Sequence, residues 1–381
     1  MATAPAVLAT AAPGEVRLTR AQERYYFASQ WKLIWWRLRR HRLAMVSLWV
    51  LAVLYAMVPF VEFLSPYALR SRHPDHVYHP PQRIRFFDQG RFVGPFVYGT
   101  LMAVDTETLQ RTHREDPTRV YRLRLLARGE PYLWWGLVPG ERHLVGVEDG
   151  GTLYLLGTDR LGRDMLSRII YGARVSLSVG LFGVALSLVL GIILGGISGF
   201  YGGTTDSVIQ RVIEFLRSLP DIPILLALAA VMPLRWPPLL VYFFITLVLA
   251  LFGWTGLARV VRGRFLALRE EDYILAARFT NCSEGRIIFR HMVPAFTSHL
   301  IAATTLALPV MILTETSLSF LGLGLRPPVI SWGVLLQEAQ NLQTVSLFPW
   351  LLLPCIPVIV IVLAFNFMGD GLRDAADPYV R

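Results

Sequence analysis

Lysine is almost absent from this sequence. Lys32 is the only lysine among 37 basic residues, and no glycine-rich loop is followed by a lysine. A nucleotide-binding loop of the Walker type needs that lysine to reach the phosphates, so an ATPase site of this type within the chain is excluded. Cysteine is scarce as well. Cys282 and Cys355 fall in segments expected on the cytoplasmic side and inside a bilayer, so we expect no disulfide.

Charged residues are few for a soluble protein of this length. Of the 381 residues 17% are charged and 54% are hydrophobic, and the mean hydropathy is +0.47. A surface in water needs more polar side chains, so the composition predicts an all-α polytopic membrane protein. The net charge of +10 is therefore interpreted through membrane topology, and we expect no nucleic-acid partner.

Apolar runs of about 20 residues, the length of a membrane-crossing helix, occur in six windows. The third is the least regular, because Arg211 and Glu214 lie in its first half. The first run begins only near Leu43, too late for a cleaved signal peptide. The six predicted transmembrane helices are 43–64, 175–199, 208–232, 238–258, 294–316 and 346–368.

Arginine placement predicts how these helices are oriented. The segment before the first helix and the 259–292 loop are rich in arginine, whereas the 233–237 and 317–345 loops carry one arginine each. Short cytoplasmic loops are enriched in basic residues, so both termini are expected in the cytoplasm. The arginine-rich region 65–174 is long enough to be exempt from this rule.

Two segments outside the helices have their own character. Aromatic and basic residues mixed over 22–42 predict an amphipathic helix in the lipid headgroup region, preceded by a loose tail over 1–20. Residues 65–156 alternate apolar and polar side chains, with turns expected at Gly90, Gly129–Pro131, Gly140 and Gly150–Gly151, which predicts a small β-rich extracytoplasmic insertion. The predicted organisation is a cytoplasmic tail and interfacial helix 1–42, helix 43–64, insertion 65–156, and a helical core 157–381 that ends in a tail 369–381.

Glycines in the second predicted helix are regularly spaced. Gly191, Gly195 and Gly199 recur every four residues on one helical face, which favours close approach of another helix; simple tolerance of glycine in lipid is the alternative.

A different cluster, His73, Asp75, His76 and His79, has spacing typical of metal ligands. Prolines interrupt it and no second cluster accompanies it, so we expect no metal site.

The cytoplasmic loop 270–293 has the pattern of a helix, a sharp turn and a second helix. Acidic residues at 270–272 suit a helix N-terminus, Asn281 tolerates the left-handed conformation that ends a helix, and Ser283 is suited to open the next one. A loop built in this way is a rigid handle rather than a flexible tether.

This loop resembles the EAA loop of ABC importer permeases, which docks the ATPase subunit. The segments 156–177 and 315–333 and the ending GDGLRDAADP at 369–378 are similar to signatures of the C-type permease of dipeptide, oligopeptide, nickel and opine importers. The resemblance covers about 20–64 and 156–381, and the insertion 65–156 resembles an extended periplasmic version. It implies ATPase-coupling residues at Tyr273, Leu275, Ala276, Ala277, Arg278, Asn281 and Ser283.

The sequence departs from this motif at two positions. Leu275 stands where the motif usually has glutamate, and Asn281 where it has glycine. Asparagine is well suited to a left-handed turn, so the handle is expected to fold. The loss of the glutamate places in question any charged contact with the ATPase at this position.

The resemblance implies a non-catalytic transmembrane subunit in the bacterial inner membrane, forming half of a pathway for oligopeptides. It also implies a second homologous permease, two ATPase subunits that carry ATP and magnesium, and a periplasmic solute-binding protein, with membrane lipid around the helices. No cofactor is expected in this chain. Oligosaccharides, opines or metal chelates are alternative solutes; a secondary transporter and a membrane-bound hydrolase are alternatives from other classes.

Three residues near the outer end of the fifth predicted helix are candidates for a gate or pathway: Glu315, Ser317 and Trp332. For Glu315 the alternative is an interfacial carboxylate bonded to Thr314, Ser317 or a neighbouring helix. Arg163 and Asp164, before the second helix, either line the substrate entrance or anchor the helix. Prolines at 220, 223, 354 and 357 would break the third and sixth helices, which favours a lined pathway.

Overall fold

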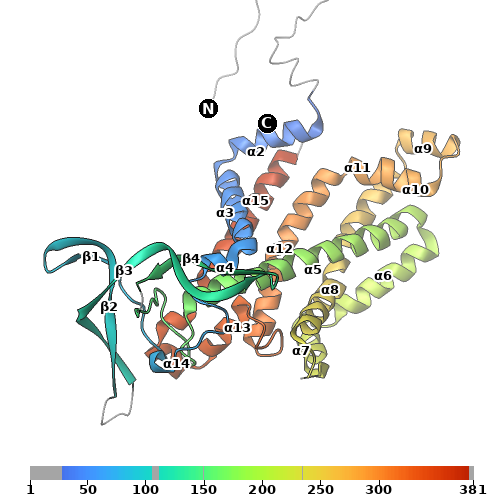
Figure 1. Ribbon diagram of the computed structural model, residues 1–381. Helices are drawn as coiled ribbons and strands as arrows, with labels where there is room; N and C mark the ends of the chain where they lie inside the picture. Colours follow the sequence, from blue (N-terminus) through green and yellow to red (C-terminus); the bar gives the residue numbers. More distant parts are fainter. Residues whose placement is uncertain (1–27, 105–110, 149, 234, 377–381) are drawn as a thin grey trace, which may run out of the picture.

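The computed structural model describes residues 28–104, 111–148, 150–233 and 235–376, which form a helical bundle with a β-rich arm on one side (Figure 1). Within these residues, five helical segments are long and apolar enough to cross a membrane. The segments are Arg42–Leu64, Met165–Tyr201, Pro238–Leu268, Thr297–Phe320 and Pro349–Ala376. The first contains α3 (Arg42–Met57), η1 (Val58–Phe60) and α4 (Val61–Leu64); the next three are α5, α8 and α12; the last contains η5 (Pro349–Leu352) and α15 (Cys355–Ala376).

The third predicted helix, 208–232, is not one continuous helix. It is divided into α6 (Gly203–Ser218) and α7 (Asp221–Val231). Pro220 disfavours helical backbone at the residue before it, and Leu219 accordingly has extended angles, φ −83° and ψ 136°. Neither piece alone has the length and hydropathy of a crossing segment.

Helix α5 is the centre of the bundle, with α8 and α12 packed along it. The three regularly spaced glycines of α5 face α8: a Cβ at Gly191 would lie 2.8 Å from the Cβ of Leu257, and one at Gly195 would overlap the carbonyl oxygen of Ala258. A Cβ at Gly199 would lie 2.8 Å from the carbonyl oxygen of Arg262. The two helix backbones therefore approach closely along this seam, which requires glycine.

Within the predicted β-rich insertion 65–156, four strands between Arg85 and Val147 form an antiparallel sheet in the order β1-β2-β3-β4. Two of the predicted turns are wrong, because Gly129 lies inside β3 and Gly140 inside β4. The missing side chains make room for rings: a Cβ at Gly140 would lie 2.7 Å from the Tyr132 ring, and one at Gly129 would meet His143. The strands are β1 (Arg85–Asp88), β2 (Arg91–Val104), β3 (Arg111–Trp134) and β4 (Val138–Val147).

The ends of the described chain differ from the predicted boundaries. The amphipathic helix is α2 (Gln30–Arg40), with residues 1–27 outside the described residues, and α15 continues to Ala376, so most of the expected tail 369–381 is helical; 377–381 lie outside the described residues. Helix α2 and the end of α15 lie at the same end of the bundle as α9 (Asp272–Phe279) and α10 (Glu284–Arg286) (Figure 1). The remaining short elements are η2 (Pro74–His76), η3 (Ile287–Met292), α11 (Val293–Ala295), α13 (Trp332–Leu336), η4 (Gln337–Gln340) and α14 (Leu342–Leu347).

Candidate functional site

The loop 270–293 folds as the predicted helix–turn–helix, which we call the handle (residues 272–295). Helix α9 ends at Phe279, and the left-handed conformation predicted at Asn281 is confirmed by its φ of 56°. The N–H of Cys282 donates to the carbonyl of Ala277 at 3.1 Å, which satisfies a free carbonyl at the helix end. Ser283 precedes α10 as expected, although its side chain makes no capping hydrogen bond.

The inner face of the handle is anchored by apolar side chains. Ile274, Ile287 and Met292 are fully buried and pack in one cluster with Val261 and Phe265 of α8. Burying a side chain of this size stabilises the packed state by roughly 1.5–3 kcal/mol. The handle is therefore held against the helical bundle as a rigid body.

The outer face of the handle is exposed. Phe279 is 89% exposed and Phe289 is 65% exposed, so two aromatic rings of this face are open to contact. Phe289 was not among the predicted site residues; helical periodicity in the run Ile287-Ile288-Phe289 was the available signal. Six of the seven predicted coupling residues share this exposure: Tyr273, Leu275, Ala276, Arg278, Asn281 and Ser283.

Ala277 is the exception within the predicted coupling set. It is buried in the same apolar cluster as Ile274, against the bundle rather than toward an external partner. Because α9 turns by about 100° per residue, adjacent Ala276 and Ala277 face different surroundings. The structure therefore separates the two alanines that the sequence grouped.

Glu315 lies in a polar cluster with no exposure to solvent. Its Oε1 accepts hydrogen bonds from the hydroxyls of Ser319 at 2.7 Å and Ser331 at 2.8 Å. Ser331 is the N-cap of α13, so the bond to a neighbouring helix is present, whereas the carboxylate bonds neither Thr314 nor Ser317 among the described contacts. Ser331 also caps α13 by accepting from the N–H of Val334. The carboxylate thus ties α12 to the segment that follows it.

The three predicted gate residues do not meet on one surface. Trp332 is buried and fixed to α5, where its N–H donates to Ser176 and its indole N–H donates to the Ile169 carbonyl, both at 3.1 Å. Ser317 is exposed, whereas Glu315 is not. Glu315 and Trp332 therefore hold α5, α12 and α13 together, whereas Ser317 lies on the exposed surface.

A cavity of about 610 Å³ lies between α5, α6, α7, α8 and α12. Its walls are mainly apolar, and Arg217 is the only charged residue that lines it in the described part of the chain. Hydroxyl groups of Ser187, Thr255 and Thr314 also line it. None of these was singled out as a pathway residue from the sequence. The break at Pro220 was predicted, but which side chains of the surrounding helices meet at this cavity depends on tertiary packing.

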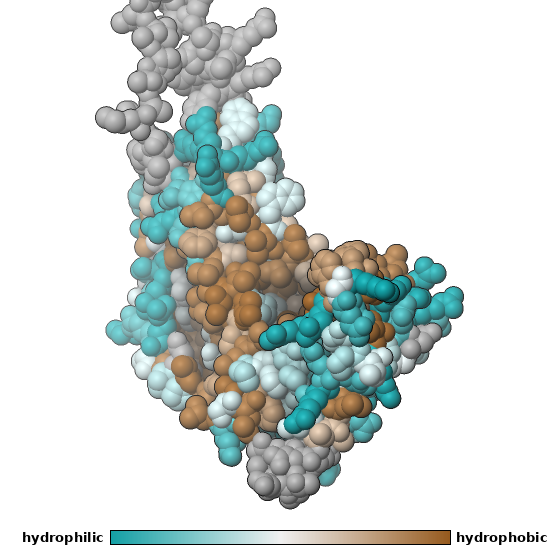
Figure 2. Space-filling model, turned by 90° about the vertical axis from the view of Figure 1, so that its left-hand side faces the viewer, coloured by the Kyte–Doolittle hydropathy of each residue, from teal (hydrophilic) through white to brown (hydrophobic). Residues whose placement is uncertain are grey.

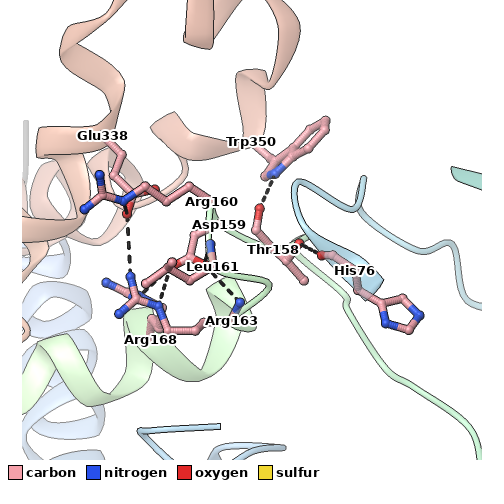
Figure 3. A network of polar contacts seen from close by, with 9 residues as sticks. All are labelled: His76, Thr158, Asp159, Arg160, Leu161, Arg163, Arg168, Glu338 and Trp350. Carbon is pink, nitrogen blue, oxygen red and sulfur yellow. Dashed lines mark hydrogen bonds and ion pairs between the residues drawn. The ribbon is translucent and has the colours of Figure 1, made fainter. Parts of the chain in front are cut away.

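A buried ionic network fixes the N-terminal end of α5, where chain segments far apart in the sequence meet (Figure 3). The Oδ2 of Asp159 accepts from Arg163 Nε at 2.6 Å and from Arg168 at 2.7 Å, and Asp159 and Arg168 are almost fully buried. Glu338 of η4 lies 3.6 Å from Arg163. Burial, followed by the charge on Asp159, raises the pKa of Glu338 to about 7. We call this group the outer joint (Asp159, Arg163, Arg168 and Glu338).

Asp164 and Thr158 complete the contacts around the outer joint. Asp164 is the N-cap of α5 and accepts from the N–H and hydroxyl of Ser167, both at 2.7 Å. The carbonyl of Thr158 accepts from the Trp350 indole at 2.9 Å, and its hydroxyl donates to the His76 carbonyl (Figure 3). The geometry of Arg163 and Asp164 is that of anchors for α5.

The histidines that resembled metal ligands lie beside this joint in a ring cluster. His79 and His113 have ring centroids 4.7 Å apart, and burial together with His113 lowers the pKa of His79 to about 3. Across the described residues, no group of three or more His, Cys, Asp or Glu side chains is arranged to hold a metal ion.

Two family models match this chain. Residues 187–381 match "Binding-protein-dependent transport system inner membrane component", and residues 29–81 match "N-terminal TM domain of oligopeptide transport permease C". Neither model covers residues 82–186, where most of the β-rich insertion lies.

Named relatives are similar over the larger part of their own length. The oligopeptide transport system permease protein OppC of Bacillus subtilis (strain 168) is 37% identical over 59% of this chain and 72% of its own. The dipeptide transport system permease protein DppC of the same organism is 40% identical over 59% and 68%. The glutathione transport system permease protein GsiD of Pectobacterium atrosepticum is 37% identical over 61% and 75%. A solved structure of the MetNI methionine ABC transporter matches 55% of this chain and 97% of its own, with 17% identity and a TM-score of 0.42.

Proposed function

This chain belongs to the binding-protein-dependent transport system inner membrane components, as a permease subunit of an ABC importer, and from that premise we propose that it forms half of a translocation pathway for oligopeptides. The relatives named for oligopeptide, dipeptide and glutathione transport support a peptide solute. Oligosaccharides, opines and metal chelates are the alternatives for the same machinery.

The proposed topology has six crossings, with α6 and α7 together forming the one that the break at Pro220 divides. A broken crossing is tolerated where protein or a water-lined cavity satisfies the freed backbone groups, and both pieces line the 610 Å³ cavity. Both termini and the handle would face the cytoplasm, and the β-rich insertion the periplasm. The shared location of α2, α9 and the end of α15 at one end of the bundle supports this orientation (Figure 1).

The proposed partners are a second homologous permease, two ATPase subunits and a periplasmic binding protein. ATP and magnesium would be bound by the ATPases, and this chain would be non-catalytic. The observation that carries the coupling role is the contrast between the two faces of the handle. Its inner face is locked to α8 by buried side chains, and its outer face exposes Phe279 and Phe289.

This contrast suggests how movement is passed on. An ATPase that grips the outer face would displace the handle as a rigid body, and α8 would move with it through the buried cluster. Helix α5 packs against α8 and carries the outer joint at its other end, so displacement at the handle would reach the opposite membrane surface. Alternating access of the cavity would follow.

The test is copurification of the ATPases with the Phe279→Glu variant, together with ATP-driven uptake of a labelled oligopeptide in proteoliposomes. We expect loss of both, because a charge replaces an apolar contact. The matched control is Phe92→Glu, a phenylalanine that is 70% exposed on β2. Full ATPase retention in Phe279→Glu would overturn the coupling role. The unchanged complex could also retain its ATPases and take up another class of solute but no peptide. That result would leave the permease role intact and overturn the peptide assignment.

A further inference from the structure

The turn that joins β3 and β4 has an unusual composition for a turn. Residues 133–138 read Leu-Trp-Trp-Gly-Leu-Val, and we call them the hairpin tip. Turns are usually polar because their backbone lies in water. Here Leu137 is 82% exposed, and Leu133, Trp135 and Val138 are each more than half exposed. The described residues of this chain do not cover these four apolar side chains. An apolar environment from outside the chain would remove them from water.

The hairpin tip is fixed to one end of the crossing segment Arg42–Leu64. The indole N–H groups of Trp134 and Trp135 donate to the carbonyl of Pro59 at 2.6 and 3.1 Å. The guanidinium of Arg174 lies 4.3 Å above the Trp135 ring and is paired with Glu62 at 2.6 Å. The tip is therefore held beside the C-terminal end of this apolar segment.

The exposed apolar surface of the tip is continuous with that of the crossing segment. On α3 and η1 the exposed apolar side chains are spaced three to seven residues apart along one face, which is the surface that a membrane helix presents to lipid. Phe60, at the end of this face, lies 5.6 Å from the Trp134 ring. Figure 2 shows a hydrophobic column beside a hydrophobic upper side on the β-rich arm. The face consists of Leu43, Val46, Trp49, Val53 and Phe60.

Two positive charges lie further along the same strand ladder as the hairpin tip. Arg128 and Arg142 are directly opposite each other in the β3–β4 ladder and both are exposed. Like charges in this position are destabilising unless an anion lies between or near them. Within the described residues neither arginine is in an ion pair, so phosphate groups of lipid would supply the missing charge.

We propose that the hairpin tip inserts into the headgroup region of the adjacent membrane surface, so that the β-rich insertion rests on the bilayer instead of standing free in the periplasm. Tryptophan is suited to the headgroup region because its ring is amphipathic, and arginine is suited to it because the guanidinium pairs with lipid phosphate. The occupant of the apolar surface is phospholipid. A protein partner at the same surface is an outcome that the test separates.

The test places an environment-sensitive fluorophore on Leu137→Cys in a chain with Cys282→Ser and Cys355→Ser, within the importer complex in lipid nanodiscs. Leu101→Cys is the matched control, since Leu101 is 51% exposed on the distal part of β2. We expect blue-shifted emission at 137, strong quenching by lipids spin-labelled near the headgroup, weaker quenching by lipids labelled at the chain end, and little by aqueous iodide. For the probe at position 101 we expect quenching by aqueous iodide and none by the spin-labelled lipids. A helix or turn in the interface lies about 5–10 Å deep, which these quenchers resolve.

Two outcomes overturn the proposal. Quenching of the 137 probe by iodide alone would place the tip in water. Protection from both iodide and lipid quenchers would place it against a protein. Leu133→Cys, a second exposed position on the tip, repeats the measurement should labelling at 137 disturb assembly.

Discussion

The handle and the outer joint lie at opposite ends of α5 and are attached to the bundle in opposite ways. The handle is held by apolar side chains such as Ile274 and Ile287, whose packing has no preferred direction. The outer joint is held by Asp159 between two arginines, whose hydrogen bonds require defined geometry. Apolar packing lets the handle and α8 move together without breaking directional bonds, whereas a buried ionic network favours one arrangement. The comparison suggests a moving element at one end of α5 and a fixed point at the other.

The largest effect is expected from Asp159→Asn. The substitution keeps an acceptor for the backbone but removes the charge that compensates buried Arg168, so stability should fall by about 3–5 kcal/mol. The measurement is the fraction of intact protein after heating, followed by size-exclusion chromatography.

The control for Asp159→Asn is Glu115→Gln, whose pair with Arg85 is more than 40% exposed on both sides and should contribute only about 0–1 kcal/mol. If both variants lost equal stability, the outer joint would not be a special anchor.

The next effect distinguishes the two alanines of the handle. Ala277→Trp should disrupt the inner face, at about 1–3 kcal/mol for overpacking, and hydrogen exchange should show α9 opening while the rest of the bundle stays protected. Ala276→Trp should leave α9 protected but weaken ATPase copurification. Equal exchange in both variants would contradict the assignment of their faces.

A smaller effect is expected at the turn of the handle. Asn281→Val should cost about 1–2 kcal/mol, because a β-branched residue is strained at a φ of 56°, and Asn281→Gly should be tolerated. Hydrogen exchange of α9 and ATP-driven uptake report this difference. A tolerated valine would show that the turn does not need the left-handed conformation.

The smallest effect is a pH dependence at the outer joint. The pKa of Glu338 is raised in the folded protein to about 7, so its contribution to stability is present at low pH and is lost as the pH rises through 7. Compared with the Glu338→Gln variant, we expect the unchanged chain to lose on the order of 1 kcal/mol more thermal stability as the pH rises from about 4.5 to 7. His79, with a folded pKa of about 3, contributes a pH dependence of the opposite sign, but it does so in both variants and therefore cancels from the comparison. An unchanged slope in Glu338→Gln would assign the effect to another group.

The handle was the part of the site that could be predicted best, because its signals are local. Acidic residues at 270–272, the left-handed preference of asparagine and the apolar run after it act within one or two helical turns. Which side chains of the handle face the bundle and which face outward could not be predicted from these local signals. Ala276 and Ala277 are chemically identical, and only the position of α8 decides which of them is buried.

The sequence by itself determined the membrane class, the positions of five crossing segments, the β-rich insertion and the turn at Asn281, because hydropathy, alternation and backbone preference are properties of short segments. Tertiary structure decided which residues meet. It joined Asp159 to Arg168 and Glu338, paired Glu315 with Ser331 and placed Gly140 inside a strand beside Tyr132. These contacts depend on how helices and strands that are distant in the chain pack against one another. The cost of burying a charged group, and the contact of the Tyr132 ring with Gly140, arise only once that packing exists.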